Sequence, residues 1–256
     1  LKKDGSMSAK SMEVNIDLPG YVVEKKFTSR KNSVFLVKNM LASAEPQYLV
    51  YKKYAYPERM PGEVAMLRVL QAEGIAVPQV YEENKDYILL EYLEGPLLLD
   101  CYTRQEGISG SYSDYLDEPT HRLIHLLCRW FKDFYKVVHS IRDQQLLMGD
   151  VNFRNFIMVK GKIYGIDLEE WREGRIEKEI GSLCAFALTY DPTFTRWKLA
   201  MVRELLKVFI GDLNLDKKML QKAVEQELVF LGQIRGTAEE YDSFLAGDLF
   251  AKIFRV

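Results

Sequence analysis

The spacing of apolar and polar positions changes along the chain, from strand-like at first to helical later. Runs rich in β-branched and aromatic residues predict strands at 21–27, 34–38, 47–54, 77–81 and 87–92. One helix is predicted among them, from Glu63 to about Gly74, because apolar residues recur there at helical spacing. We therefore expect this part of the chain to form a mostly antiparallel sheet with one inserted helix.

The remainder of the chain has the pattern of helices interrupted by one strand pair. The clearest helix has an apolar stripe with a period of 3.6 residues, formed by Ile124, Leu127, Cys128, Phe131, Tyr135 and Val138. Strands 156–159 and 163–166 are predicted on either side of Lys160-Gly161-Lys162. Further helices are predicted over 178–190, 196–211 and, with breaks, 216–256.

These elements predict an α+β fold with two lobes. The sequence Leu93-Glu94-Gly95-Pro96 breaks the pattern between them. Residues 1–19 are polar and lack periodicity, which predicts a flexible N-terminal tail. We expect a β-rich lobe over 20–94 and a larger, mostly helical lobe over 95–256.

Composition narrows the classes of function. Lys and Arg number 35 and Asp and Glu 37, so the net charge of −2 argues against a protein that binds nucleic acid by neutralising phosphates. Glu91 and Glu94 interrupt the richest apolar stretch, so no segment reaches the roughly 18 apolar residues of a membrane span. The N-terminus has no apolar secretory core, which predicts a cytoplasmic protein. Nothing in the pattern indicates an oligomeric state.

The residues that suggest chemistry lie around the second strand pair. Asp150 and Asn155 are separated by four residues in a predicted loop, and Asp167 directly follows strand 163–166. A tight strand pair folds back on itself, which brings Asp167 close to Asn155. Their oxygens suit Mg²⁺ that holds phosphates, and Asp150 is placed to take a proton from an attacking hydroxyl. The alternative is that both aspartates only cap turns.

Met148-Gly149-Asp150, with Asn155, and Ile166-Asp167-Leu168-Glu169 resemble two motifs of the protein-kinase-like superfamily. The resemblance is to its branch of aminoglycoside phosphotransferases and other small-molecule kinases. It implies a kinase-like fold that uses ATP or GTP with Mg²⁺. In these terms Asp150 is the catalytic base, and Asn155 and Asp167 are the metal ligands.

Three upstream features occur in the order that this fold requires. Leu49-Val50-Tyr51-Lys52 is similar to the strand whose lysine binds the nucleotide phosphates, with the adjacent Lys53 as the alternative. Glu63 matches the helix glutamate that pairs with this lysine. The stretch from Tyr87 to Gly95 is similar to the strand and hinge that bind adenine, where Glu91 and Leu93 supply backbone partners.

The chain also departs from the family pattern. Residues 27–33 contain no glycine, so the usual glycine-rich phosphate loop is absent, and Met148 replaces the usual histidine. Residues 168–179 contain no Ser, Thr or Tyr and leave little room for a peptide-binding platform, which favours a small-molecule acceptor. Glu169 or Glu170 is a further metal or substrate contact, or part of a solvated turn.

The nature of the acceptor stays open between two classes. Acidic residues favour a cationic acceptor such as an aminoglycoside or amino alcohol, namely Asp114, Asp117, Glu118, Glu239, Glu240, Asp242 and Asp248. A solvated acidic face explains them equally well, and a sugar acceptor is the other possibility.

The sequence thus predicts a phosphotransferase that moves the γ-phosphate of ATP or GTP to a hydroxyl of a small molecule. Two alternatives remain: a pseudokinase-like binding module without turnover, favoured by the glycine-free turn, and an atypical protein kinase.

Overall fold

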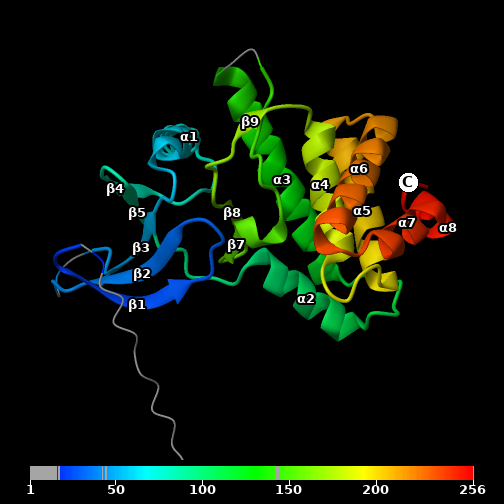
Figure 1. Cartoon of the computed structure of the whole chain (residues 1–256), viewed down its shortest axis with the longest axis horizontal. Helices are drawn as coiled ribbons and strands as arrows, with labels where there is room; N and C mark the ends of the chain where they lie inside the picture. Colours follow the sequence, from blue (N-terminus) through cyan, green and yellow to red (C-terminus); the bar gives the residue numbers. More distant parts are fainter. Residues whose placement is uncertain (1–15, 17, 42, 44, 142–143, 256) are drawn as a thin grey trace, which may run out of the picture. The chain divides into compact units, whose positions relative to one another are not determined.

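Two structural units divide the residues that the computed structural model describes, which are 16, 18–41, 43, 45–141 and 144–255. The first unit contains the described residues up to Met60 together with Val80–Tyr92. The second contains Pro61–Gln79 and the described residues from Leu93 onward (Figure 1). The predicted α+β class is confirmed, because strands and helices both make up large parts of the chain.

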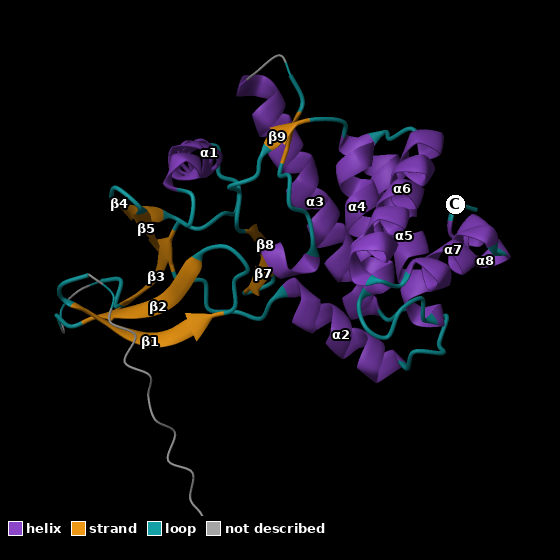
Figure 2. Ribbon diagram, in the orientation of Figure 1, coloured by secondary structure: helices purple, strands orange, loops and turns teal. Residues whose placement is uncertain are grey.

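The first unit is a five-stranded antiparallel sheet with the strand order β1-β2-β3-β5-β4 (Figure 2). Its strands are β1 (Tyr21–Phe27), β2 (Ser33–Asn39), β3 (Tyr48–Lys53), β4 (Val80–Glu83) and β5 (Tyr87–Glu91). Alternate residues of β2, β3 and β5 point to one face, where Val37, Leu49 and Leu89 form an apolar core.

Two boundaries of this unit differ from the sequence prediction. The predicted tail over 1–19 lies mostly outside the described residues, but Leu18 is buried in the apolar core of the sheet. The strand predicted at 77–81 begins instead at Val80. Pro78 has no backbone N–H to donate to a sheet, and Val77 is buried in the second unit.

The second unit is built around a long helix, α3 (Figure 1). All six residues of the apolar stripe predicted for this helix are buried. The helices are α1 (Met60–Ala72, whose first residue is grouped with the first unit), α2 (Leu98–Ser109), α3 (Glu118–Ile141), α4 (Ile176–Thr189), α5 (Arg196–Leu213), α6 (Lys217–Arg235), α7 (Ala238–Ala246) and α8 (Asp248–Ile253). None of the described helices is long and apolar enough to cross a lipid bilayer.

Two short strand pairs complete the second unit. They are β6 (Leu146–Leu147) with β9 (Arg172–Glu173), and β7 (Phe156–Val159) with β8 (Lys162–Gly165). The turn between β7 and β8 consists of Lys160 and Gly161, both with positive φ, as a two-residue hairpin requires. Helix α2 and the strands β6 and β9 were not predicted from the sequence.

The grouping of α1 differs from the predicted division at residue 94. The segment after α1 is bound to other elements of the second unit, because the Ala76 carbonyl accepts hydrogen bonds from Trp130 Nε1 and from the Gly165 amide, both at about 2.9–3.0 Å. Trp130 in turn stacks on Phe134 of α3. The helix that was predicted within the β-rich lobe over 20–94 therefore belongs, apart from its first residue, to the second unit.

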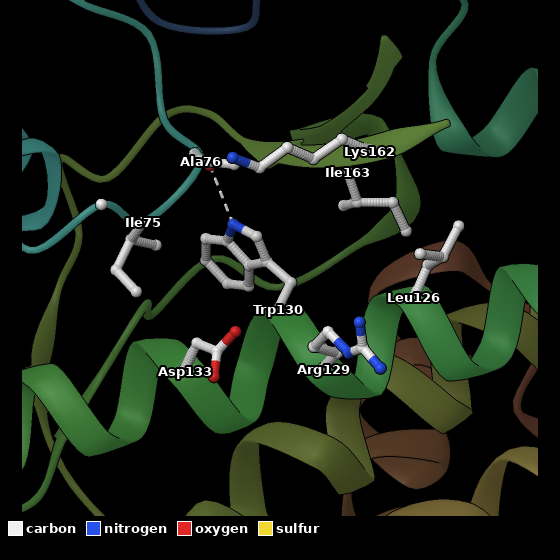
Figure 3. Close-up of a pocket in the computed structure, with 9 residues that line it drawn as sticks. Ile75, Ala76, Leu126, Arg129, Trp130, Asp133, Lys162 and Ile163 are labelled. Carbon is white, nitrogen blue, oxygen red and sulfur yellow. Dashed lines mark hydrogen bonds between the residues drawn. The ribbon is translucent and has the colours of Figure 1, made fainter. Parts of the chain in front are cut away.

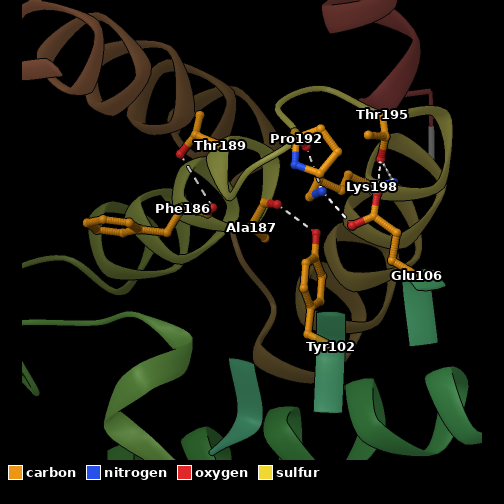
Figure 4. Close-up of polar contacts among 8 residues, drawn as sticks. All are labelled: Tyr102, Glu106, Phe186, Ala187, Thr189, Pro192, Thr195 and Lys198. Atoms are coloured by element: carbon orange, nitrogen blue, oxygen red, sulfur yellow. Dashed lines mark hydrogen bonds and ion pairs between the residues drawn. The ribbon is translucent and has the colours of Figure 1, made fainter. Parts of the chain in front are cut away.

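A buried ion pair joins α2 to α5 (Figure 4). Lys198 Nζ lies 2.5 Å from Glu106 Oε2 and also donates to the Pro192 carbonyl at 2.7 Å. The Thr195 hydroxyl donates to the other oxygen of Glu106 at 2.5 Å. The Lys198 side chain is fully buried and that of Glu106 nearly so. These contacts satisfy both charges and fix the loop between α4 and α5.

We predict that Lys198→Met lowers the free energy of unfolding by about 3–5 kcal/mol, because it leaves the Glu106 carboxylate buried without its cation. Adding Glu106→Gln removes that charge and should recover most of the loss. Urea unfolding measures both variants. Lys207→Met breaks an exposed pair with Glu204 and should cost at most about 1 kcal/mol. Equal losses in Lys198→Met and Lys207→Met would contradict this prediction.

Candidate active site

The loop that begins at Asp150 is held in shape by its own asparagines. Asn155 Nδ2 donates to the Asp150 carbonyl at 2.8 Å, and Asn152 Nδ2 donates to Asp150 Oδ1 at 3.1 Å. Asn152 Oδ1 accepts from the Arg154 amide at 2.9 Å and caps a short 3-10 turn, η2 (Phe153–Asn155). The sequence-predicted residues Asp150 and Asn155 therefore lie in direct contact, with the side-chain amide of Asn155 bonded to the backbone of Asp150.

Asp167 lies next to this loop, as the hairpin predicted. The Ile166 amide donates to the Asn155 carbonyl at 2.9 Å, which joins the end of β8 to the loop that precedes β7. Asp167 itself has a φ of 61°, a conformation that residues other than glycine adopt with some strain.

Glu63, Asp167 and Glu169 form an acidic cluster. One carboxylate oxygen from each residue lies within 4.8 Å of the other two. The Glu63 side chain is buried, and its Oε1 accepts a hydrogen bond from the Leu168 amide at 3.2 Å. Glu63 of α1 is thus fixed beside Asp167, which is more than a hundred residues away in the sequence. Carboxylate oxygens at this spacing have the chemistry of a site for a hard divalent cation.

Glu179 is a residue of the candidate site that the sequence analysis missed. Its carboxylate accepts hydrogen bonds from the amides of Met148 (3.2 Å) and Gly149 (2.8 Å) and from the hydroxyl of Tyr135 (2.7 Å). Helix α4 therefore holds the backbone directly before Asp150. In the sequence Glu179 lies in the first turn of a predicted helix, where an acidic residue is ordinary, so no local signal identified it.

Burial dominates the electrostatics of Glu179. It raises the pKa of the carboxyl above its usual range, while the hydrogen bonds from Gly149, Tyr135 and Met148 and the charge of Arg172 oppose this rise. Burial and the nearby Glu179 carboxylate raise the pKa of Tyr135 well above its usual value. Tyr135 therefore keeps its proton and donates it to the hydrogen bond.

Gly149 allows the Asp150 loop to approach the acidic turn. Its φ is 97°, and a Cβ at this position would lie 1.9 Å from the Glu170 carbonyl oxygen. Both the backbone conformation and the close approach therefore require glycine. The backbone directly before Asp150 therefore lies against that of Glu170.

Lys52 and Lys53 of the first unit occupy different environments. Lys52 is buried on the strand β3, with its Nζ 5.0 Å from the centre of the Tyr54 ring. Lys53 is half exposed and lies 3.1 Å from Asp86. The preferred residue, Lys52, is thus the buried one. The pairing of Lys52 with Glu63 stays a prediction.

The adenine contact predicted for Glu91 and Leu93 also stays a prediction. Glu91 ends β5 in the first unit, opposite Leu49, whereas Leu93 is buried in the second unit. The glycine-free turn between β1 and β2 is closed by its own side chains. The Asn32 amide donates to Ser29 Oγ at 3.2 Å, and Asn32 Oδ1 accepts from the Ala55 amide at 3.0 Å.

A pocket of about 90 Å³ lies beside Trp130 in the second unit (Figure 3). Arg129, Trp130 and Asp133 of α3 line one side of it, and Lys162 and Ile163 of β8 line another. Its lining includes none of the predicted site residues. It is much smaller than the roughly 300 Å³ or more of typical small-molecule pockets, so it is not a nucleotide site.

The acidic residues considered for a cationic acceptor have structural contacts in several cases. Asp114 pairs with Arg196, and Asp117 accepts hydrogen bonds from the amide and hydroxyl of Thr120 at the start of α3. Glu240 accepts a hydrogen bond from the Thr193 hydroxyl. Glu118, Glu239 and Asp248 lie in the first turns of helices, and Asp242 lies within α7. Local structure therefore accounts for many of these charges.

Comparison of the chain with protein-family models and with curated proteins found no match. The site is therefore interpreted from its geometry and from the motifs in the sequence.

We predict that the free energy of unfolding of the wild type, relative to that of Glu179→Gln, decreases as the pH rises. The folded state holds the Glu179 proton more tightly than the unfolded chain does, because its pKa is raised. The stabilisation is full below the unfolded carboxyl pKa of about 4.3 and is lost as pH rises through the folded pKa.

The measurement is the free energy of unfolding in urea between pH 4 and 7, by roughly half-unit steps, for both proteins. The value for wild type minus that for Glu179→Gln should decrease over this range. Glu225→Gln, on the exposed face of α6, is the matched control. A difference between wild type and Glu179→Gln that is constant or increases with pH would exclude this role for burial.

Proposed function

We propose that the chain is a Mg²⁺-dependent phosphotransferase that moves the γ-phosphate of ATP or GTP to a hydroxyl of a small molecule. The proposal includes a bilobal kinase-like arrangement of the two units. It rests on one observation above all: the Asp150 loop and the acidic cluster around Asp167 are joined within one structural unit. The bond from the Ile166 amide to the Asn155 carbonyl makes that connection.

Each residue then has a role in the transfer. Asp150 accepts the proton of the acceptor hydroxyl while the oxygen of that hydroxyl bonds to the γ-phosphorus. The bond from this phosphorus to the β–γ bridging oxygen breaks, and the nucleoside diphosphate leaves. Lys52 binds the phosphates, and Glu63 positions Lys52. Glu91 and Leu93 bind adenine through their backbone groups.

The donor set fits Mg²⁺. Asp167 and Glu169 offer carboxylate oxygens, and Asn155 offers Oδ1 because its Nδ2 is bonded to the Asp150 carbonyl. When bound, the ion supplies positive charge that neutralises the phosphates during transfer. Glu179 and Gly149 hold the backbone of Asp150 at the position from which it can accept the proton.

A nucleotide-binding module without turnover is the second candidate. It is favoured by the turn between β1 and β2, where Ser29 and Asn32 bond the backbone groups of the turn and of Ala55. A backbone that is bonded in this way offers fewer amides to phosphates than a glycine-rich loop does. A protein kinase is disfavoured because α4 begins at Ile176, only nine residues after Asp167.

We predict that ATP or GTP raises the thermal midpoint only with Mg²⁺. Ligand at about a hundredfold over its dissociation constant stabilises by about 2.7 kcal/mol, a shift of about 2–4 °C for a chain of this size. Asp167→Asn should abolish the Mg²⁺-dependent part. Asp242→Asn makes the same chemical change at an exposed site in α7 and should retain it. If neither nucleotide shifts the wild-type midpoint, the proposed function is wrong.

We predict that Asp150→Asn binds Mg²⁺–ATP like wild type but transfers phosphate at least about 100-fold more slowly, since it removes the general base and keeps the size of the side chain. Formation of ADP with water as the acceptor measures this rate without knowledge of the natural acceptor. The binding module predicts instead that wild type and Asp150→Asn form no ADP above the same background.

A further inference from the structure

Tyr190 connects the Asp150 loop to the helical part of the second unit. Its hydroxyl oxygen accepts a hydrogen bond from the Phe153 amide at 2.9 Å, and its ring packs against Phe153. The side chain is only 7% exposed. Tyr190 is therefore held against the loop that contains the candidate base. The charged residues around Tyr190 are the ones that an acceptor near this loop would contact.

Arg154 lies beside the Tyr190 ring. Its guanidinium carbon is 5.5 Å from the centre of the Tyr190 ring, and its backbone amide is bonded to Asn152. The residue is exposed, and its guanidinium makes no ion pair or hydrogen bond with any other residue in the described part of the chain. Its position is fixed through the loop, and its donors remain available to a ligand.

Arg235, the last residue of α6, is bonded to the residue directly before Tyr190. One nitrogen, Nη1, donates to the Thr189 carbonyl and to the Tyr241 hydroxyl, both at 3.0 Å. The guanidinium also lies over the Phe186 ring at 5.8 Å. These contacts orient one edge of the group. Among the described residues, none accepts a hydrogen bond from its Nη2 or Nε.

The electrostatics of Tyr190 link these groups to Asp150. Burial raises the pKa of Tyr190 to about 12, the charges of Arg154 and Arg235 act against this rise, and the charge of Asp150 adds to it. All three charged groups therefore act on one hydroxyl. Two guanidinium groups therefore lie near Tyr190, whereas Asp114, Asp117 and Glu240 are engaged in the contacts described above.

We propose that the acceptor is a small hydroxyl compound that carries a carboxylate or phosphate group, which Arg154 and Arg235 bind while the hydroxyl reaches Asp150. A guanidinium group binds either anion through charge-assisted, often paired, hydrogen bonds. This inference rests on the proposed function and narrows its acceptor to the anionic class. It replaces the cationic class that the acidic residues of the sequence favoured.

A series of three-carbon compounds tests the charge of the acceptor. Glycerol is neutral, glycerate carries a carboxylate, glycerol 3-phosphate carries a phosphate and 3-amino-1,2-propanediol is a cation. Each is added to the protein in EDTA at constant ionic strength, and the thermal midpoint is measured. We expect one or both anions to raise the midpoint and the other two compounds to leave it unchanged. The anion with the larger shift identifies the preferred group.

Variants locate the binding. Arg154→Gln and Arg235→Gln should each weaken binding of the preferred anion about tenfold or more, because each removes a charge-assisted contact. Arg154→Lys keeps the charge and should weaken binding less than Arg154→Gln. Arg203→Gln removes an exposed arginine that donates to the Arg255 carbonyl, and it should bind like wild type.

The proposal is overturned if neither anion shifts the midpoint, if the cation gives the larger shift, or if the shift persists in the Arg154→Gln/Arg235→Gln double variant. These outcomes are separate from the nucleotide test. An anion shift without any Mg²⁺–nucleotide shift would refute the phosphotransferase and keep the anion site. The reverse result would keep the phosphotransferase and refute the anionic acceptor.

Discussion

The geometry of the candidate site depends on a carboxylate that is buried in the second unit. Glu179 accepts hydrogen bonds from the two amides that precede Asp150 and from Tyr135. A buried carboxylate is costly unless its lone pairs are satisfied, and here the backbone of the loop satisfies them. The same bonds hold the loop in one conformation. These bonds also attach the loop to helix α4.

The acidic cluster shows how the second unit brings distant residues together. Glu63 comes from α1, and Asp167 and Glu169 come from the turn after β8. The bond from the Leu168 amide to Glu63 and the bonds of Ala76 to Trp130 and Gly165 fix this arrangement. Carboxylate oxygens suit a hard divalent cation, which is what the proposed chemistry requires.

The loop between α4 and α5 connects these helices to the Asp150 loop. It starts at Tyr190, which bonds the Phe153 amide, and it is held at Pro192 by Lys198. Burying an ion pair has a high desolvation cost, because both charges must be satisfied away from water. Here it keeps Tyr190 in place, and with it the ring over which Arg154 lies.

Much of the local structure followed from the sequence, because it depends on periodicity and turn chemistry. The alternation in β1, β2, β3 and β5, the apolar stripe of α3 and the hairpin around Gly161 each reflect residues close together in the chain. The contact between the Asp150 loop and the end of β8 could also be predicted, since a two-residue turn forces the strands to fold back. Helix α2 carries few apolar residues in a regular stripe and was therefore missed.

Contacts between residues far apart in the chain determine features that periodicity does not predict. Glu179 and Tyr135 have nothing in their local sequence to mark them, and their role exists only because α3 and α4 meet at the loop before Asp150. The grouping of α1 with the second unit likewise depends on Trp130 and Gly165, far away in the chain. The sequence by itself determined most of the elements and marked the candidate residues for chemistry. Tertiary structure selected their partners, because hydrogen bonds and charge interactions act through distance in space and carry no local pattern.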